Sequence, residues 1–268
     1  MRRTYLTGTR TAVLVAAIAA TIVPVAQASA QGGDGTRVRV GLGGQSRPEY
    51  PGADSNEWAP LLDVSIARGD NLFEADAPDE SFSPALISAG GFKAGPALAL
   101  EGSRKESEVG APVGRVPATF EAGAFVQYEI NPSIRLRAEA RQGLGGHKGL
   151  VGSLGADYVW RDGDRYVFTL GPRLLLSSGR YQRAYFGVTP EAALAAGLPV
   201  YRPDGGIHGV AAASGLHMSL GGALGLFGFA RYERLVGDAR RSPIVREFGS
   251  PNQLSAGLGL SYAFQLSR

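Results

Sequence analysis

The segment SAGLGLSYAF, residues 255–264, alternates strictly between two kinds of side chain. One parity holds Ala256, Leu258, Leu260, Tyr262 and Phe264, and the other holds only glycine, serine and alanine. Because a strand points successive side chains to opposite faces, the segment is expected to form a strand with one apolar face and one face of small residues. What each face contacts is the first question that this chain raises.

The same alternation recurs along the chain in segments of about ten residues, the length of a tilted strand that crosses a membrane. The clearest segments are 118–129, 133–141, 150–160 and 166–176; weaker ones are 36–44, 58–67, 94–102 and 207–219, and 223–235 is irregular. The large aromatic side chains stand near the segment ends, as at the interfaces of an outer-membrane barrel, whereas a soluble core would hold them in mid-strand. The pattern therefore predicts an all-β, transmembrane, antiparallel up-and-down β-barrel. A soluble, exported β protein stays open as the alternative fold.

The connections between these segments alternate between short and long. Short turns are predicted at 131–132, 161–164 and 221–222, and long loops at 45–57, 103–116, 177–206 and 236–252. Outer-membrane barrels combine short periplasmic turns with long outer loops. Balancing the alternation requires two further short strands near 71–76 and 82–90, which gives twelve strands. Ten or fourteen strands remain open because the region 70–102 is irregular.

The first thirty residues resemble a secretory signal peptide. Three arginines precede an apolar run over 11–23, and small residues at 26–30 provide cleavage sites after Ala30 or after Ala28. We therefore expect a mature barrel domain over 31–268, which has as many acidic as basic residues, since the three leader arginines are part of 27 basic against 24 acidic residues. A neutral mature chain gives no support to nucleic-acid binding. The absence of cysteine excludes disulfides and thiolate metal sites.

Many charged residues share the parity that would face the barrel interior. These luminal candidates are Arg37, Arg39, Asp63, Glu121, Glu129, Arg135, Arg137, Glu139, Arg141, Asp157, Arg173 and His217. They could pair across strands and make the barrel rigid, or they could line a solute path with a charged constriction. Because twelve strands leave a modest lumen, we favour the first interpretation.

The three histidines predict no catalytic, metal or cofactor site. His147 lies in a glycine-rich turn and is expected to be exposed or at the membrane interface, with Asp157 about 30 Å away along the next strand, too far to orient its ring. His217 is expected to face the lumen and His208 to lie in solvent. An outer-membrane hydrolase, which would need a Ser–His or Asp–His arrangement, is therefore the least favoured function.

Two long loops carry further signals. TPEAALAAGL, residues 189–198, predicts a short helix with Thr189 as N-cap, Pro190 in the first position and Gly197 at the end. This helix could cover the barrel mouth or simply pack on its rim. Arg240, Arg241 and Arg246 form a basic loop that could contact lipopolysaccharide phosphates, or whose charges could be solvated.

Several stretches resemble the MipA/OmpV family of outer-membrane proteins. They are RPEYPGAD (47–54), GGHKG (145–149), YFGVTPEAALAAGLPVY (185–201) and, most closely, residues 228–264. The resemblance covers nearly all of the mature chain and carries over no catalytic residue. It implies a barrel in the outer membrane of a Gram-negative bacterium, surrounded by outer-membrane lipid, that serves as a scaffold for a murein-degrading transglycosylase and a murein synthase. Within the matched outer segments, Tyr50, Asp54 and His147 are candidate contact residues.

The sequence thus supports three functions in decreasing order. The first is a scaffold without enzymatic activity, the second is a narrow pore for small polar solutes, and the third is an outer-membrane hydrolase.

Overall fold

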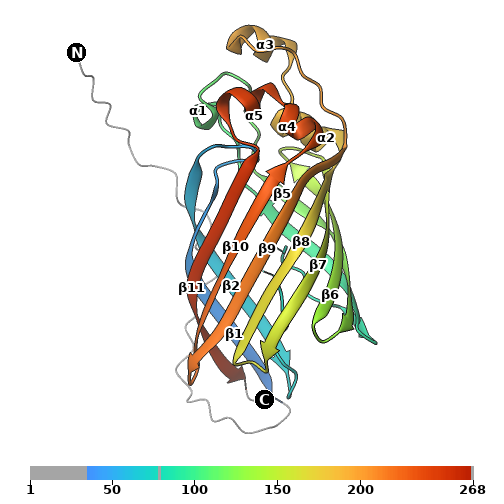
Figure 1. The fold of residues 1–268 in the computed structure, drawn as a ribbon, viewed down its shortest axis with the longest axis vertical. Helices are drawn as coiled ribbons and strands as arrows, with labels where there is room; N and C mark the ends of the chain where they lie inside the picture. Colours follow the sequence, from blue (N-terminus) through green and yellow to red (C-terminus); the bar gives the residue numbers. More distant parts are fainter. Residues whose placement is uncertain (1–34, 78–79, 267–268) are drawn as a thin grey trace, which may run out of the picture.

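The computed structural model describes residues 35–77 and 80–266, and the predicted signal peptide lies outside them. Within these residues, eleven antiparallel strands form one curled sheet (Figure 1). The strands are β1 (Thr36–Pro48), β2 (Asn56–Arg68), β3 (Ile87–Ala89), β4 (Phe92–Glu101), β5 (Thr119–Asn131), β6 (Ile134–Gly145), β7 (Leu150–Asp162), β8 (Tyr166–Ser177), β9 (Gly206–Gly221), β10 (Leu224–Leu235) and β11 (Asn252–Leu266). The predicted all-β antiparallel architecture is confirmed.

The sheet order is β2-β1-β11-β10-β9-β8-β7-β6-β5-β4-β3. Strands that follow each other in sequence pair as antiparallel neighbours, except β2 and β3. β1 also pairs with β11, so that Thr36 lies opposite Leu266 and the two ends of the described domain lie side by side. The edge strands are β2 and β3, and within the described ranges no hydrogen-bonded ladder joins them. Tight turns gather at one end of the sheet and long loops with helices at the other (Figure 1). Following the barrel pattern, we call these the periplasmic end and the outer end.

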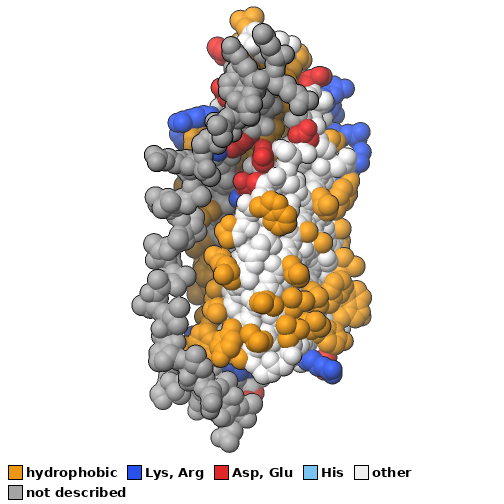
Figure 2. Space-filling model, turned by 90° about the vertical axis from the view of Figure 1, so that its left-hand side faces the viewer, with side chains coloured by type: hydrophobic (Ala, Val, Ile, Leu, Met, Phe, Trp, Pro, Cys, Tyr) orange, Lys and Arg blue, Asp and Glu red, His pale blue; other side chains and the backbone are white. Residues whose placement is uncertain are grey.

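The two parities of β11 correspond to the two faces of the curled sheet. Leu258 and Leu260 are exposed on the outside of the curled sheet, whereas Ser261 is buried on the inside. The glycines of β11 face the lumen, where the ring of Phe227 packs against Gly259. Figure 2 shows the outcome on one face, where hydrophobic side chains spread over the strands and charged side chains lie toward the two ends. An outward apolar surface over polar lumen-facing residues is the pattern of a membrane barrel.

The region after β2 departs from the prediction. Residues 71–76 are not a strand; the chain enters the lumen instead, where Phe73 and Ala77 are 4% and 3% exposed. It returns to the wall at Phe82, which exchanges two backbone hydrogen bonds of 2.9 Å with Leu98 of β4, and continues into β3. The predicted strand over 82–90 is therefore present only in part. We call residues 70–77 and 80–81 the luminal limb.

Two physical reasons explain why the limb leaves the wall. Pro84 lies between Phe82 and the start of β3, and a proline cannot donate to a strand ladder. The acidic side chains of the limb also find basic partners inside the barrel, as described below. Within the described residues the sheet therefore has eleven strands, and the predicted number of twelve stays a prediction.

The outer loops fold into five short helices. They are α1 (Glu106–Val109), α2 (Gly179–Phe186), α3 (Pro190–Ala196), α4 (Gly237–Arg241) and α5 (Pro243–Phe248). Only α3 was predicted, and its start is as expected, because the Thr189 side chain accepts a hydrogen bond of 3.2 Å from the Ala192 amide. It lies at the outer tip of the molecule and does not cover the lumen (Figure 1). None of the helices in the described ranges is long and apolar enough to cross a membrane.

Two apolar clusters hold these helices together. One joins Tyr50 to residues of α1, α3 and α5, and the other joins Tyr181, Tyr185 and Phe186 of α2 to residues of α4 and α5. We call the outer loops with these helices, residues 49–55, 103–118, 178–205 and 236–251, the outer cap.

Candidate functional site: the barrel lumen

A ladder of charged side chains runs along the inside of β6, β7 and β8. The sequence RLRAEAR places Arg135, Arg137, Glu139 and Arg141 on the same face of β6, because alternate residues of a strand share a face. Arg135 Nη2 lies 2.7 Å from Asp157 Oδ2, and Arg137 Nη2 lies 2.7 Å from Glu139 Oε2. These side chains are almost fully buried in the lumen.

Each carboxylate of this ladder forms ion pairs with two arginines. Asp157 also binds Arg173 of β8 at 2.8 Å, and Glu139 also binds Arg141. Arg141 in turn donates to Glu121 of β5 at 2.8 Å. In these pairs four arginines, Arg135, Arg137, Arg141 and Arg173, face three wall carboxylates, Asp157, Glu139 and Glu121, an arrangement that attracts negative charge.

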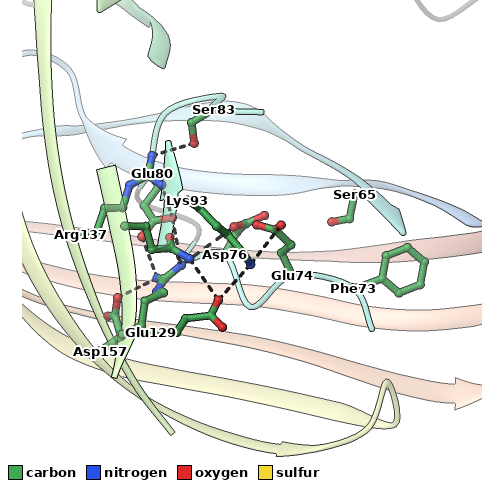
Figure 3. Close-up of polar contacts among 12 residues, drawn as sticks. Ser65, Phe73, Glu74, Asp76, Glu80, Ser83, Lys93, Glu129, Arg137 and Asp157 are labelled. Carbon is green, nitrogen blue, oxygen red and sulfur yellow. Dashed lines mark hydrogen bonds and ion pairs between the residues drawn. The ribbon is translucent and has the colours of Figure 1, made fainter. Parts of the chain in front are cut away.

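The luminal limb provides that negative charge. Glu80 Oε1 lies 2.7 Å from Arg135 Nη2, and Glu80 Oε2 lies 3.8 Å from Arg137 Nη1. Nearer the periplasmic end, Lys93 Nζ lies 3.2 Å from Glu74 and 2.9 Å from Glu129. Figure 3 shows the limb carboxylates directed toward these cations across the lumen. The limb is thus bound to the wall by ion pairs.

The backbone of the limb is anchored at Phe73. Its amide donates to Asp164 Oδ1 at 3.0 Å, and its carbonyl accepts from Arg161 Nη2 at 2.6 Å. The guanidinium groups of Arg37 and Arg39 stack on its ring, with Cζ atoms 5.1 and 4.7 Å from the ring centroid. These contacts hold the limb inside the periplasmic part of the lumen.

A cavity of about 290 Å³ remains between the limb and the outer cap. Glu80 and Arg137 lie at its limb side, Glu139 and Arg141 along its wall, and Tyr181 of the cap at its outer side. The lining is strongly polar and carries charges of both signs. The cavity is therefore bordered by the limb toward the periplasmic end and by the cap toward the outer end, and we call it the chamber, with the limb as its floor.

His147 is buried at the top of this chamber, which corrects the expectation of an exposed or interfacial residue. Its Nδ1 accepts from the Gly149 amide at 3.0 Å, so the proton resides on Nε2, which donates to Glu121 Oε1 at 2.9 Å. The ring folds back onto Gly143, where a Cβ atom would lie only 2.3 Å from it. With both ring nitrogens engaged, His147 positions the turn and has no free nitrogen to activate a nucleophile.

The other two histidines are also enclosed. His208 was expected in solvent, but it is buried with its ring centroid 5.4 Å from that of Tyr181, because β9 begins before it and draws it under α2. His217 faces the lumen, stacked on Phe227 at 5.9 Å. Within residues 35–77 and 80–266, no group of three histidine or acidic side chains could hold a metal ion.

The remaining predicted positions divide between the lumen and the cap. All twelve luminal candidates lie on the inner face of the sheet, Arg39 and Asp63 forming a pair at 3.5 Å on the opposite wall. Tyr50 is buried in an apolar cluster, which removes it from the contact candidates, since the cap folds around its ring. Asp54 is exposed. Arg240, Arg241 and Arg246 are exposed on α4 and α5 and line one groove.

Sequence reasoning missed Arg104, the most buried charged residue of the cap. Its guanidinium donates to the carbonyls of Tyr185 at 2.6 Å, Gly114 at 3.0 Å and Val113 at 3.4 Å. Burial lowers its pKa, and burial also raises the pKa of the neighbouring Tyr185 phenol, which stays neutral. No local pattern distinguishes Arg104 from the exposed charges that follow it. The limb residues, in contrast, had a signal in the acidic run EADAPDE over 74–80.

Comparison with known proteins assigns the family. The family model described as "MltA-interacting protein MipA" matches residues 40–264. No curated protein matches the chain. Among solved structures, KdgM porin is 8% identical, covering 85% of this chain and 99% of its own, with a TM-score of 0.38. The COG4313 outer membrane channel from Pseudomonas putida F1 is 11% identical, covering 91% and 100%, with a TM-score of 0.39. With a family match over most of its length and a sheet that is apolar outside and charged inside, this chain is an outer-membrane β-barrel protein that belongs to the MipA family.

Proposed function

We propose that the protein is a scaffold without enzymatic activity, which binds a murein transglycosylase and a murein synthase from the outer membrane. The observation that carries the proposal is the packing inside the barrel: the limb lies in the lumen toward the periplasmic end and the outer cap packs at the other end, so a role at the surface fits better than free passage. The name of the family, which describes MipA as an MltA-interacting protein, supports the same role. The engaged nitrogens of His147 support a role without catalysis.

The partner surface would be the periplasmic end, where the tight turns lie. Asp162 and Arg165, in the turn between β7 and β8, are its most accessible charged pair, with side chains 59% and 81% exposed. A partner that docks at this end would contact them without any change in the barrel.

The test is to refold the full mature chain in detergent, immobilise it and identify what it retains from the periplasmic extract of its own organism. We expect a murein transglycosylase or synthase, with less retained by the double variant Asp162→Ala, Arg165→Ala. Leu194→Ser, which changes an exposed residue of α3 at the outer tip, is the matched control and should retain as much as the parent. Retention of neither enzyme would contradict the proposal.

The chamber favours a second candidate function, a gated pore for small polar solutes. Its lining carries many charged side chains, it holds about 290 Å³ of space, and the limb lies on its periplasmic side. This function predicts discrete conductance steps in a planar bilayer that change in size when Arg135 or Arg137 is replaced by glutamine. A silent bilayer with correctly folded protein would exclude it.

We also propose that the groove lined by Arg240, Arg241 and Arg246 contacts lipopolysaccharide phosphates, because arginine binds phosphate through paired donors. Replacing all three by glutamine should weaken co-purification of lipopolysaccharide with the barrel. Unchanged lipopolysaccharide content would leave these arginines as solvated loop charges.

A further inference from the structure

The floor of the chamber is held by side chains rather than by a strand ladder. The carboxylates of Glu74 and Glu80 pair with wall cations, and the Phe73 amide bonds to a carboxylate. Just before the limb, Gly69 has a φ of +57°, a left-handed conformation that glycine adopts without strain. A segment held in this way can leave the lumen when its ionic contacts are replaced.

The Glu80 carboxylate contacts the wall arginines as the carboxylate of a bound ligand would. Its carboxylate reaches Arg135 and Arg137 on adjacent same-face positions of β6, and both arginines are buried. The wall carboxylates near them are shared, Asp157 with Arg173 and Glu139 with Arg141. Glu80 adds a carboxylate to a wall where four arginines face three carboxylates, and a pair of guanidinium groups binds a carboxylate through charge-assisted hydrogen bonds.

The chamber gives a ligand direct access to this place. Glu80 and Arg137 both line the cavity of about 290 Å³, which also borders Arg173. A small molecule inside it would meet Arg137 and the Glu80 carboxylate directly, and it would reach Arg135, 2.7 Å from Glu80, once that carboxylate is displaced. The cavity carries charges of both signs, so a ligand with polar groups beside its carboxylate is accommodated.

We propose that Arg135 and Arg137 form a binding site for a small carboxylate-bearing solute, that Glu80 occupies this site in the resting barrel, and that the solute displaces the luminal limb. The inference extends the second candidate function by naming its solute class. A solute can bind inside the barrel without passing through it, so solute binding and conductance are measured separately.

The absence of cysteine from the chain allows a direct test. Ala77→Cys places a thiol on the buried face of the limb, and its reaction with a water-soluble maleimide reports release of the limb. With the full mature chain refolded in detergent, we expect slow labelling that glutarate accelerates severalfold. Glutaramide, which has the same carbon chain without charge, and potassium chloride at equal ionic strength should have no such effect. Inorganic phosphate distinguishes carboxylate from general anion recognition and should act more weakly than glutarate.

Variants assign the effect to the proposed residues. Glu80→Gln should raise the labelling rate without ligand, and Arg135→Gln with Arg137→Gln should abolish the response to glutarate. Arg231→Gln removes an inward arginine that forms an ion pair of 2.7 Å with Glu233 in the same strand. This variant should keep the acceleration by glutarate. Calorimetric binding of glutarate to the chain without the engineered cysteine provides a second measurement if Ala77→Cys fails to fold.

Equal labelling rates with and without glutarate, in protein that shows the heat-dependent gel shift of a folded barrel, would overturn the proposal. So would equal acceleration by glutaramide, phosphate or potassium chloride. Displacement of the limb by glutarate in a barrel that stays silent in the bilayer would retain the binding site and remove the pore.

Discussion

Different forces hold the two elements that narrow the barrel, the outer cap at one end and the luminal limb at the other. At the outer end, Tyr185, Phe186 and Ile244 pack with no more than 1% of their surface exposed. At the periplasmic end, the limb is held by ion pairs and by hydrogen bonds to charged side chains. The outer closure is an apolar core, and the periplasmic closure is an electrostatic contact.

The difference implies that only one of the two closures is built to open. Burial of a large apolar side chain stabilises a fold by roughly 1.5–3 kcal/mol and is insensitive to moderate salt. A partly exposed ion pair of the limb such as Lys93–Glu74 contributes ~0–1 kcal/mol and weakens as salt screens it, whereas the buried Arg135–Glu80 pair is screened less. The outer cap should therefore remain closed under conditions that release the limb.

The largest expected effect comes from the apolar core of the cap. Phe186→Ala removes a fully buried ring and should lower the free energy of unfolding by about 3–5 kcal/mol. Leu194→Ala on α3, where the side chain is exposed, should change it by less than ~0.5 kcal/mol. Denaturant unfolding followed by the gel shift measures both. A small loss for Phe186→Ala would show that the cap is not a packed core.

Arg104→Met should have the next largest effect. The methionine keeps part of the packing but leaves the carbonyls of Tyr185 and Gly114 without their buried donor, at a cost of about 1–3 kcal/mol. Protease sensitivity of the loop between β4 and β5 should rise with it. Arg115→Met, which changes an exposed residue of the same loop, is the control. Equal resistance of the two variants would contradict the central role of Arg104.

Glu80→Gln should destabilise the whole fold less than Arg104→Met does, but it should disorder the limb more. Because the released limb and its arginines are solvated, the free energy of unfolding should fall by only ~1 kcal/mol. Amide exchange over 71–77 should nevertheless accelerate strongly, while exchange in the outer cap stays as it was. Acceleration in both regions would mean that the limb and the cap open together.

The smallest effect concerns pH at the edge of the cap. The Asp204 amide donates to the Asp238 carboxylate at 3.0 Å, and this bond, followed by the hydrogen bond from Arg241, lowers the pKa of Asp238. A lowered pKa in the folded state means that the contact stabilises the loop above the ordinary value of 3.8 and is lost as the pH falls through the lowered value. Amide exchange at Asp204, corrected for its intrinsic pH dependence, should lose protection only in that acidic range. Asp238→Asn should remove this pH dependence.

The two regions also differ from the barrel wall in how far the sequence predicts them. A wall strand such as β11 is encoded locally, because the alternation of Leu258 and Leu260 with glycines specifies both strand and faces. The position of Glu80 depends on Arg135 and Arg137, more than fifty residues later, which no local pattern links to it. The same holds for Arg104, whose partner Tyr185 is 81 residues away. Alternation predicted which residues face inward but not which of them share a carboxylate.

The most direct test of the account compares exchange at one amide of each closure as salt is raised. The Phe73 amide bonds to Asp164 in the limb contact, and the Val188 amide bonds to the Tyr201 carbonyl at 2.8 Å in the cap. Raising the ionic strength to about 1 M shortens the screening length to ~3 Å. We expect faster amide exchange at Phe73 and unchanged amide exchange at Val188. Equal acceleration at the two amides, or none at Phe73, would contradict the claim that the periplasmic closure is electrostatic and the outer closure is not.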